Sequence, residues 1–159
     1  MRVGTRTIVT VGWPGEAVLR RKAKAVGRLG TEDYDLIEDM IATLQEVGGL
    51  GLAAPQVGVS KRILVVELEG QTHVLVDPVL RMASGTEVAV ESCLSIPDVA
   101  VPVARAYCLT AEGKNRRGKG VRIRAQGLLA RVLQHEVDHL DGILITDPER
   151  DLTNAKSVV

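Results

Sequence analysis

The segment QHEVDHLDG, which spans Gln134–Gly142, carries an H-E-x-x-H pattern inside a stretch with the apolar spacing of an α-helix. His135 and His139 are four residues apart, so on a helix they lie about 40° apart around the axis and about 6 Å apart along it. This spacing allows two imidazoles to bind one metal ion, while Glu136 can accept a proton from a water that the ion binds. The segment therefore predicts a helix that carries part of a metal-dependent hydrolase site.

The apolar residues around this segment predict a long helix over Gly127–Leu140, with Gly142 at its C-terminal cap. A second long helix is predicted over Glu32–Val47, with Thr31 as its cap, because apolar residues again recur at helical spacing. A shorter helix is predicted within Pro14–Val26. One long helix therefore lies in the N-terminal third and the other near the C-terminal end.

Runs of β-branched and alternating apolar residues predict the strands between the two long helices. They cover Arg62–Leu68, His73–Val76, Val79–Met82, Glu87–Val90, Val101–Ala111 and Gly120–Ala125, with a short extended piece at Thr7–Thr10. A solvated hairpin turn is predicted over Lys114–Lys119. This order predicts an α+β fold, in which antiparallel or mixed sheets pack around a central helix that carries His135 and His139.

The composition suits one globular domain with an apolar core, since 45% of the 159 residues are apolar and 25% are charged. Lys and Arg balance Asp and Glu at 20 each, which predicts no DNA-binding surface. No apolar run approaches the roughly 18 residues that span a bilayer, and Met1–Thr10 lacks the apolar core of a signal peptide. We expect one catalytic domain over residues 1–159, with a short polar tail at 147–159, located in the cytoplasm without a membrane partner.

The histidine pair needs a third protein ligand, because catalytic metal sites usually combine three protein ligands with a water. The candidates are His73 in a predicted strand, Glu149 downstream of the helix, and Cys93 in the segment ESCLS, Glu91–Ser95. A lone histidine in a strand is more often a surface or core residue. A thiolate binds Fe²⁺, Zn²⁺ or Ni²⁺ strongly, whereas Cys108 is interpreted as a small buried residue. These residues alone leave Cys93 and Glu149 open as alternatives.

The segment GLGLAAPQ, Gly49–Gln56, follows the first long helix and alternates glycine with apolar residues. Such glycines let a backbone run close to a ligand, and Gln56 offers an amide N–H₂ at the end of the segment. A dinucleotide-binding loop would instead follow a strand and open a helix. A ligand-binding segment and a tight turn before the next strand are both compatible with these residues.

Together, the three segments resemble the motifs of the peptide deformylase family. The family's glycine–apolar–glycine–apolar–Ala–Ala–x–Gln, Glu-Gly-Cys-Leu-Ser and Gln-His-Glu-x-Asp-His-Leu-x-Gly motifs are matched by Gly49–Gln56, Glu91–Ser95 and Gln134–Gly142. Their order and spacing also fit, and the resemblance covers roughly Thr7 to Ile145. It implies an enzyme that removes the formyl group from the N-terminal formyl-methionine of new polypeptides and releases formate.

The resemblance also implies a role for each matching residue. It implies one divalent ion per chain, Fe²⁺ first and Zn²⁺, Ni²⁺ or Co²⁺ as other ions, bound by Cys93, His135 and His139. The general acid and base would be Glu136, and the oxyanion hole would be formed by the side chain of Gln56 and the backbone N–H of Leu94. The residues expected to line the substrate cleft are Gly49, Leu50, Gly51, Leu52, Leu128 and Val132. Glu91 is expected to support a ligand, and Asp138 to support either a ligand or a helix contact.

Several positions depart from the family pattern. Ser92 stands where Gly is usual, Asp98 where Gly or Glu is frequent, and Ala100 where an Arg often lies near the peptide-binding rim. Arg131 lies one turn before His135, and we expect its stem to line the side-chain pocket while its head reaches solvent. The tail lacks the extended helix with which some bacterial members dock on the ribosome, so ribosome contact is expected to be transient at most.

Two other functions account for part of the pattern. A zinc peptidase would use the H-E-x-x-H helix with a downstream Glu, but it leaves the glycine segment and the cysteine segment unexplained. A binding protein for formylated peptides or for the ribosome would retain a metal without turnover. An α+β domain with a purely structural histidine pair would bind no stoichiometric metal.

Overall fold

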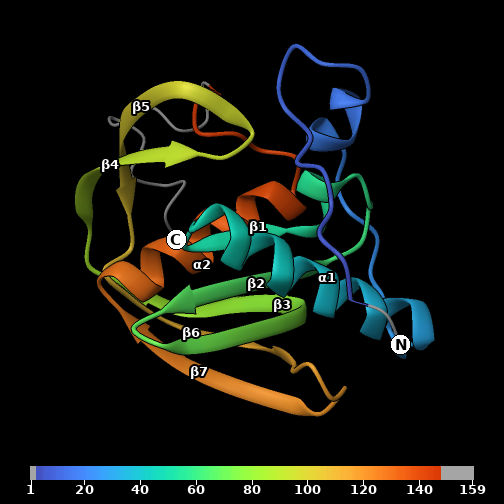
Figure 1. Ribbon diagram of the computed structural model, residues 1–159. Coiled ribbons are helices and arrows are strands. Elements are labelled where there is room, and N and C mark those ends of the chain that lie inside the picture. Colours follow the sequence, from blue (N-terminus) through green and yellow to red (C-terminus); the bar gives the residue numbers. More distant parts are fainter. Residues whose placement is uncertain (1–2, 148–159) are drawn as a thin grey trace.

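The computed structural model describes residues 3–147, which contain two α-helices and two antiparallel sheets (Figure 1). The helices are α1 (Thr31–Val47) and α2 (Leu128–Leu140). The five-stranded sheet has the order β1 (Gly51–Ala53), β2 (Ile63–Leu68), β3 (Gln71–Ser84), β6 (Cys108–Lys114) and β7 (Gly120–Gln126). The two-stranded sheet contains β4 (Glu87–Cys93) and β5 (Ile96–Arg105). The predicted α+β class with antiparallel sheets is confirmed.

Strand β2 lies between the two helices, and this explains why its first four residues are all apolar. Alternate residues of a strand face opposite sides of a sheet. Ile63 and Val65 pack in one core cluster with the apolar stripe of α1, whereas Leu64 and Val66 pack in another with α2. All four are fully buried. Both faces of β2 are therefore covered, each by one helix.

Strand β3 is one long strand, so the prediction of two strands separated by Asp77-Pro78 is wrong. The pairing between β3 and β6 shifts its register between Val76 and Val79, which marks a bulge. Asp77 has a φ of 53°, and its carboxylate accepts hydrogen bonds from the N–H groups of Val26 and Gly27 at 2.8 Å. A bulge tolerates a proline because the extra residue makes no ladder bond, so the strand continues beyond it.

The single strand predicted over Val101–Ala111 is also wrong, because β5 ends at Arg105 and β6 begins at Cys108 in the other sheet. The alternation continues through the junction and hides the change of sheet. The Gln134 side chain on α2 holds the junction, since its amide accepts from the Ala106 N–H at 2.9 Å and donates to the Ala106 carbonyl at 3.0 Å.

The ends of the helices differ from the prediction in detail. The N-cap of α1 is Gly30 rather than Thr31, and the Gly30 N–H donates to the Asp33 carboxylate at 2.8 Å. The predicted helix within Pro14–Val26 is a 3₁₀ helix, η1, over Glu16–Arg20. Gly142 follows the C-cap of α2 with a φ of 75°, and a Cβ there would lie 2.6 Å from a carbonyl oxygen of η1. Glycine is therefore required where the chain leaves α2.

The N-terminal segment with Thr7–Thr10 is not part of either sheet, but it connects the two motif segments that precede α2. The Val9 N–H donates to the Gln56 carbonyl at 2.7 Å, and the Val11 N–H donates to the Ser95 carbonyl at 2.9 Å. Gln56 belongs to a short 3₁₀ helix, η2 (Ala54–Val57), which follows β1 directly. The predicted polar tail at 147–159 lies outside the described residues, apart from its first residue.

Candidate metal centre and active site

Three side chains with metal-binding atoms converge where β4 ends beside α2. Cys93 is the last residue of β4, and His135 and His139 lie one turn apart on α2. One ligand atom from each lies within 4.8 Å of the others, and Cys93 Sγ is 3.2 Å from His139 Nε2. A thiolate and two imidazoles at such distances suit one divalent ion with a further position for water or substrate.

The two other candidate ligands are not part of this group. His73 lies on β3 opposite Val66, and burial lowers its pKa. Glu149 lies outside the described residues. Among residues 3–147, the only group of three or more potential ligands is the one formed by Cys93 and the two histidines of α2.

Glu136 is a buried carboxylate beside the three candidate ligands. Burial raises its pKa to about 7, and Oε1 has no hydrogen-bond partner among the described residues. A buried polar atom without a partner is costly in an apolar core, and its presence here fits a site that takes up a metal and a water. The donor set and this carboxylate therefore match a hydrolytic metal centre.

Strand β1 passes close to Glu136, and this approach depends on Gly51. A Cβ at position 51 would lie 2.5 Å from Glu136 Oε2 and 2.8 Å from Val132 Cγ1. These distances are shorter than real Cβ contacts, so any side chain at Gly51 would displace the carboxylate. Glycine in a strand commonly marks such a close approach of the backbone to another group.

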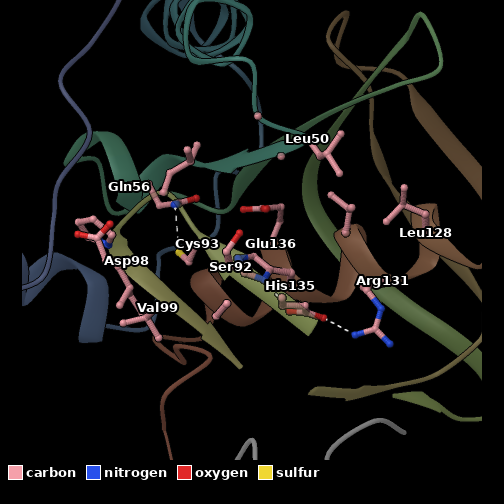
Figure 2. A pocket seen from close by; sticks show the side chains of 18 residues that line it. Leu50, Gln56, Ser92, Cys93, Asp98, Val99, Leu128, Arg131, His135 and Glu136 are labelled. Atoms are coloured by element: carbon pink, nitrogen blue, oxygen red, sulfur yellow. Dashed lines mark hydrogen bonds and ion pairs between the residues drawn. The ribbon is translucent and has the colours of Figure 1, made fainter. Parts of the chain in front are cut away.

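The Gln56 side chain is held with its amide nitrogen toward Cys93 (Figure 2). Its Oε1 accepts the Ala53 N–H at 2.9 Å, which fixes which end of the amide is the donor. Nε2 donates to Ser95 Oγ at 3.2 Å and lies 3.8 Å from Cys93 Sγ. A buried N–H₂ group is thereby presented to the metal centre.

Glu91 orients His135. Its Oε1 lies 2.8 Å from His135 Nδ1, so an N–H at Nδ1 can donate to the carboxylate while Nε2 is left for a metal. Arg105 donates to both carboxylate oxygens, and Arg131 donates to Oε2 at 2.6 Å. Burial alone would raise the pKa of Glu91, but the hydrogen bonds from Arg105 and His135 outweigh it and hold this pKa well below its usual range.

Two arginines of this network differ from what the sequence predicts. The Arg131 head was expected in solvent, but the residue is buried, and its guanidinium donates to Glu91 and to two carbonyls. Arg105 was not predicted at all, although it is almost fully buried and also pairs with Asp138 on α2. The alternation of side chains along β5 could have indicated that Arg105 is buried, because Arg105 shares a face with the buried Val103.

A cavity of about 620 Å³ opens beside the metal centre. Five of the predicted substrate residues line it, namely Gly49, Leu50, Gly51, Leu128 and Val132, together with Gln56, Cys93, Leu94, His135 and Glu136. The prediction that Leu52 lines the cleft is wrong, because this residue is fully buried and packs against α1 on the other side of β1. His139 does not line the cavity and lies beneath it as a buried residue.

The positions that depart from the family pattern lie at this cavity too, because Ser92, Asp98 and Ala100 all line it. Ser92 belongs to β4 and has no positive φ, so a side chain is tolerated where the family has Gly. Asp98 has a φ of 63°, a conformation in which glycine is favoured.

Among the helices of residues 3–147, none is both long and apolar enough to pass through a membrane.

Comparison with known proteins places these features in a family. The model of the polypeptide deformylase family matches residues 5–155. The peptide deformylase of Halothermothrix orenii is 50% identical over 135 residues, which are 84% of this chain and 88% of the relative. The Thermotoga maritima peptide deformylase structure is 39% identical, with a TM-score of 0.83 over 89% of this chain and 95% of that chain. An Acinetobacter baumannii peptide deformylase with Met-Ala-Ser bound is 32% identical, with a TM-score of 0.82 over 92% of this chain and 98% of that one. The chain therefore belongs to the polypeptide deformylase family, the metal-dependent hydrolases that remove the N-formyl group from newly made polypeptides.

Proposed function

We propose that residues 1–159 form one catalytic domain, in which Cys93, His135 and His139 bind one divalent ion and Glu136 carries protons. The observation that supports this most directly is the convergence of three ligand atoms within 4.8 Å beside a buried carboxylate. The helix α2 would be the central element of the domain, because it contributes two ligands and the carboxylate. The domain would work in the cytoplasm on nascent peptides, with at most a transient ribosome contact.

The chemistry divides between the metal and the chain. When bound, a divalent ion supplies Lewis-acid activation of water and of the formyl oxygen. Glu136 accepts the proton of the attacking water and delivers it to the leaving amine, and the burial that raises its pKa favours its action as both base and acid. The products are formate and a peptide with a free N-terminal amine.

The charge that develops on the formyl oxygen would be shared by two donors of the chain. Gln56 Nε2 is presented by the bond between its Oε1 and Ala53, so it needs no reorientation. Leu94 follows Cys93 directly and lines the cavity, and its backbone N–H would be the second donor. Donors of this kind typically contribute about 3 kcal/mol each to transition-state stabilisation.

The substrate is a peptide that begins with formyl-methionine. The Acinetobacter baumannii relative holds Met-Ala-Ser, which is the product that formyl-Met-Ala-Ser would give. In this chain, the methionine side chain would lie against Leu128 and Val132, and the peptide backbone would follow the segment from Gly49 to Gly51. A formyl carbon carries only hydrogen, so a narrow site would exclude an acetyl group.

The resident ion is proposed to be Fe²⁺, as the family resemblance implies. The thiolate and two imidazoles would also bind Zn²⁺, Ni²⁺ or Co²⁺, because affinity in such sites follows ligand type as well as supply. Metal analysis of protein purified without oxygen tests this point directly. About one iron per chain would support the proposal, and stoichiometric zinc in that sample would contradict it.

The test of the function is formate release from formyl-Met-Ala-Ser, with metal content measured on the same sample. Cys93→Ser should lose most of its metal and its activity together. Glu136→Gln should keep the metal and lose turnover by orders of magnitude. Retention of metal in the first variant, or of turnover in the second, would refute the assigned role. Cleavage of unformylated peptides would indicate a peptidase, and metal binding without formate release would indicate a binding protein.

A further inference from the structure

The candidate metal ligands come from two parts of the fold that share no sheet. Cys93 belongs to the β4–β5 hairpin, which forms its own two-stranded sheet, and the histidines belong to α2. Figure 1 shows this hairpin, in yellow, apart from the larger sheet. No backbone ladder joins the two sheets in the described part of the chain. The distance between the sulfur and the imidazoles therefore depends on the contacts that hold the hairpin in place, and those with α2 join it directly to the element that carries the histidines.

Arg131 makes three of these contacts from a single guanidinium group. Nη1 donates to Glu91 Oε2 at 2.6 Å and to the Val103 carbonyl at 2.9 Å, and Nη2 donates to the Glu87 carbonyl at 2.7 Å. Glu87 and Glu91 lie on β4, and Val103 lies on β5. One side chain of α2 thus holds both strands of the hairpin. Figure 2 shows one of these interactions as a dashed line from the Arg131 guanidinium.

The neighbouring Arg105 cannot replace it. Arg105 is the last residue of β5, so its bonds to Glu91 lie within the hairpin, and only its bond to Asp138 reaches α2. If Arg131 were lost, Glu91 would keep its partners Arg105 and His135. The bonds from α2 to the backbone carbonyls of both strands would be lost.

We propose that Arg131 is a positioning residue that fixes the β4–β5 hairpin to α2 and so sets the separation of Cys93 from the two histidines. The inference rests on the metal site proposed above. Arg131 acts through the carbonyls of β4 and β5 and through Glu91, whereas the metal ligands themselves are other residues. Fixing the separation in advance lowers the cost of assembling the ligands when a metal binds.

The test compares Arg131→Met, which keeps an unbranched apolar stem, with Arg131→Lys, which keeps the charge but has a single donor group. The control is Arg122→Met on β7, because the Arg122 side chain is 70% exposed and pairs only with Glu112 among the described residues. Zn²⁺ affinity is measured by competition with a chelator. Arg131→Met should lose about 10- to 100-fold in affinity, the usual range for residues that support metal ligands. Arg131→Lys should lie between it and the wild type, and Arg122→Met should match the wild type.

A second readout uses metal-free protein and is independent of activity. Hydrogen exchange should speed up at least tenfold in the amides of β4 and β5 of Arg131→Met, while the amides of β2 and β3 keep their wild-type protection. Unchanged Zn²⁺ affinity in a folded Arg131→Met protein would overturn the inference, as would an equal loss of protection in both sheets. A wild-type protein that binds no metal would instead refute the proposed function, so the two failures are distinguishable. If Arg131→Met does not fold, Arg131→Lys decides by the same two readouts.

Discussion

The substitution Gly51→Ala places the smallest possible side chain between β1 and Glu136. The added Cβ would lie 2.5 Å from Glu136 Oε2, and contacts of this kind become ordinary only at 3.4 Å. The carboxylate or the strand must therefore retreat by about 0.9 Å. A misplacement of about 1 Å in a catalytic group can cost about 100-fold in rate, and overpacking of a core costs about 1–3 kcal/mol of stability.

The assay is the kcat/KM of formate release from formyl-Met-Ala-Ser, together with metal content and the thermal unfolding midpoint. We expect a loss of about 100-fold in kcat/KM with metal retained, because the three atoms nearest to the new methyl group belong to Glu136 and Val132. Gly120→Ala is the matched control, since nothing lies within 4 Å of its Cβ and its φ is not positive. A Gly51→Ala enzyme with at least half of the wild-type kcat/KM would refute the reasoning about the approach of β1.

Three further substitutions or treatments have expected outcomes. Gln56→Ala should lower kcat by about 100-fold with little change in metal content, and an unchanged kcat would remove Gln56 from the oxyanion hole. Asp33→Asn should lower the free energy of unfolding at pH 7 by about 1 kcal/mol or less, because it removes the ion pair with Lys61. Burial opposes ionisation of Asp33, but the hydrogen bonds from Lys61 and Gly30 outweigh burial and lower its pKa. The difference in free energy of unfolding between the variant and the wild type should therefore vanish as the pH falls below 3.8. A difference independent of pH would contradict this. Removal of metal by a chelator should lower the unfolding midpoint and make Cys93 reactive toward a thiol reagent, and equal reactivity with and without metal would argue against Cys93 as a ligand.

The long helices could be predicted because their apolar residues repeat at a local spacing that tertiary contacts did not override. The strands were harder, and both errors arise from distant partners. The bulge after Val76 depends on the backbone N–H groups that the Asp77 carboxylate binds near Val26. The change of sheet at Ala106 depends on the Gln134 amide from α2. Neither contact leaves a periodic signal in the sequence around the junction.

The residues of the candidate site could be predicted as a set, because three short motifs carry them in order. Their supporting network could not. Whether an arginine such as Arg131 ends in solvent or in the core depends on acceptors more than 25 residues away in the chain, here Glu91 and Val103. Leu52 was assigned to the cleft because its neighbours line it, but the strand that forms there turns its side chain to the opposite face.

The hydrogen bonds of the N-terminal segment also bear on the order in which the molecule is completed during translation. Val9 and Val11 leave the ribosome early, yet their carbonyl partners are Gln56 and Ser95, which are synthesised much later. The helix that carries both histidines is made later still. The candidate metal site can therefore assemble only after α2 has left the ribosome, so a partly synthesised chain that still lacks α2 holds Cys93 without its two histidine partners.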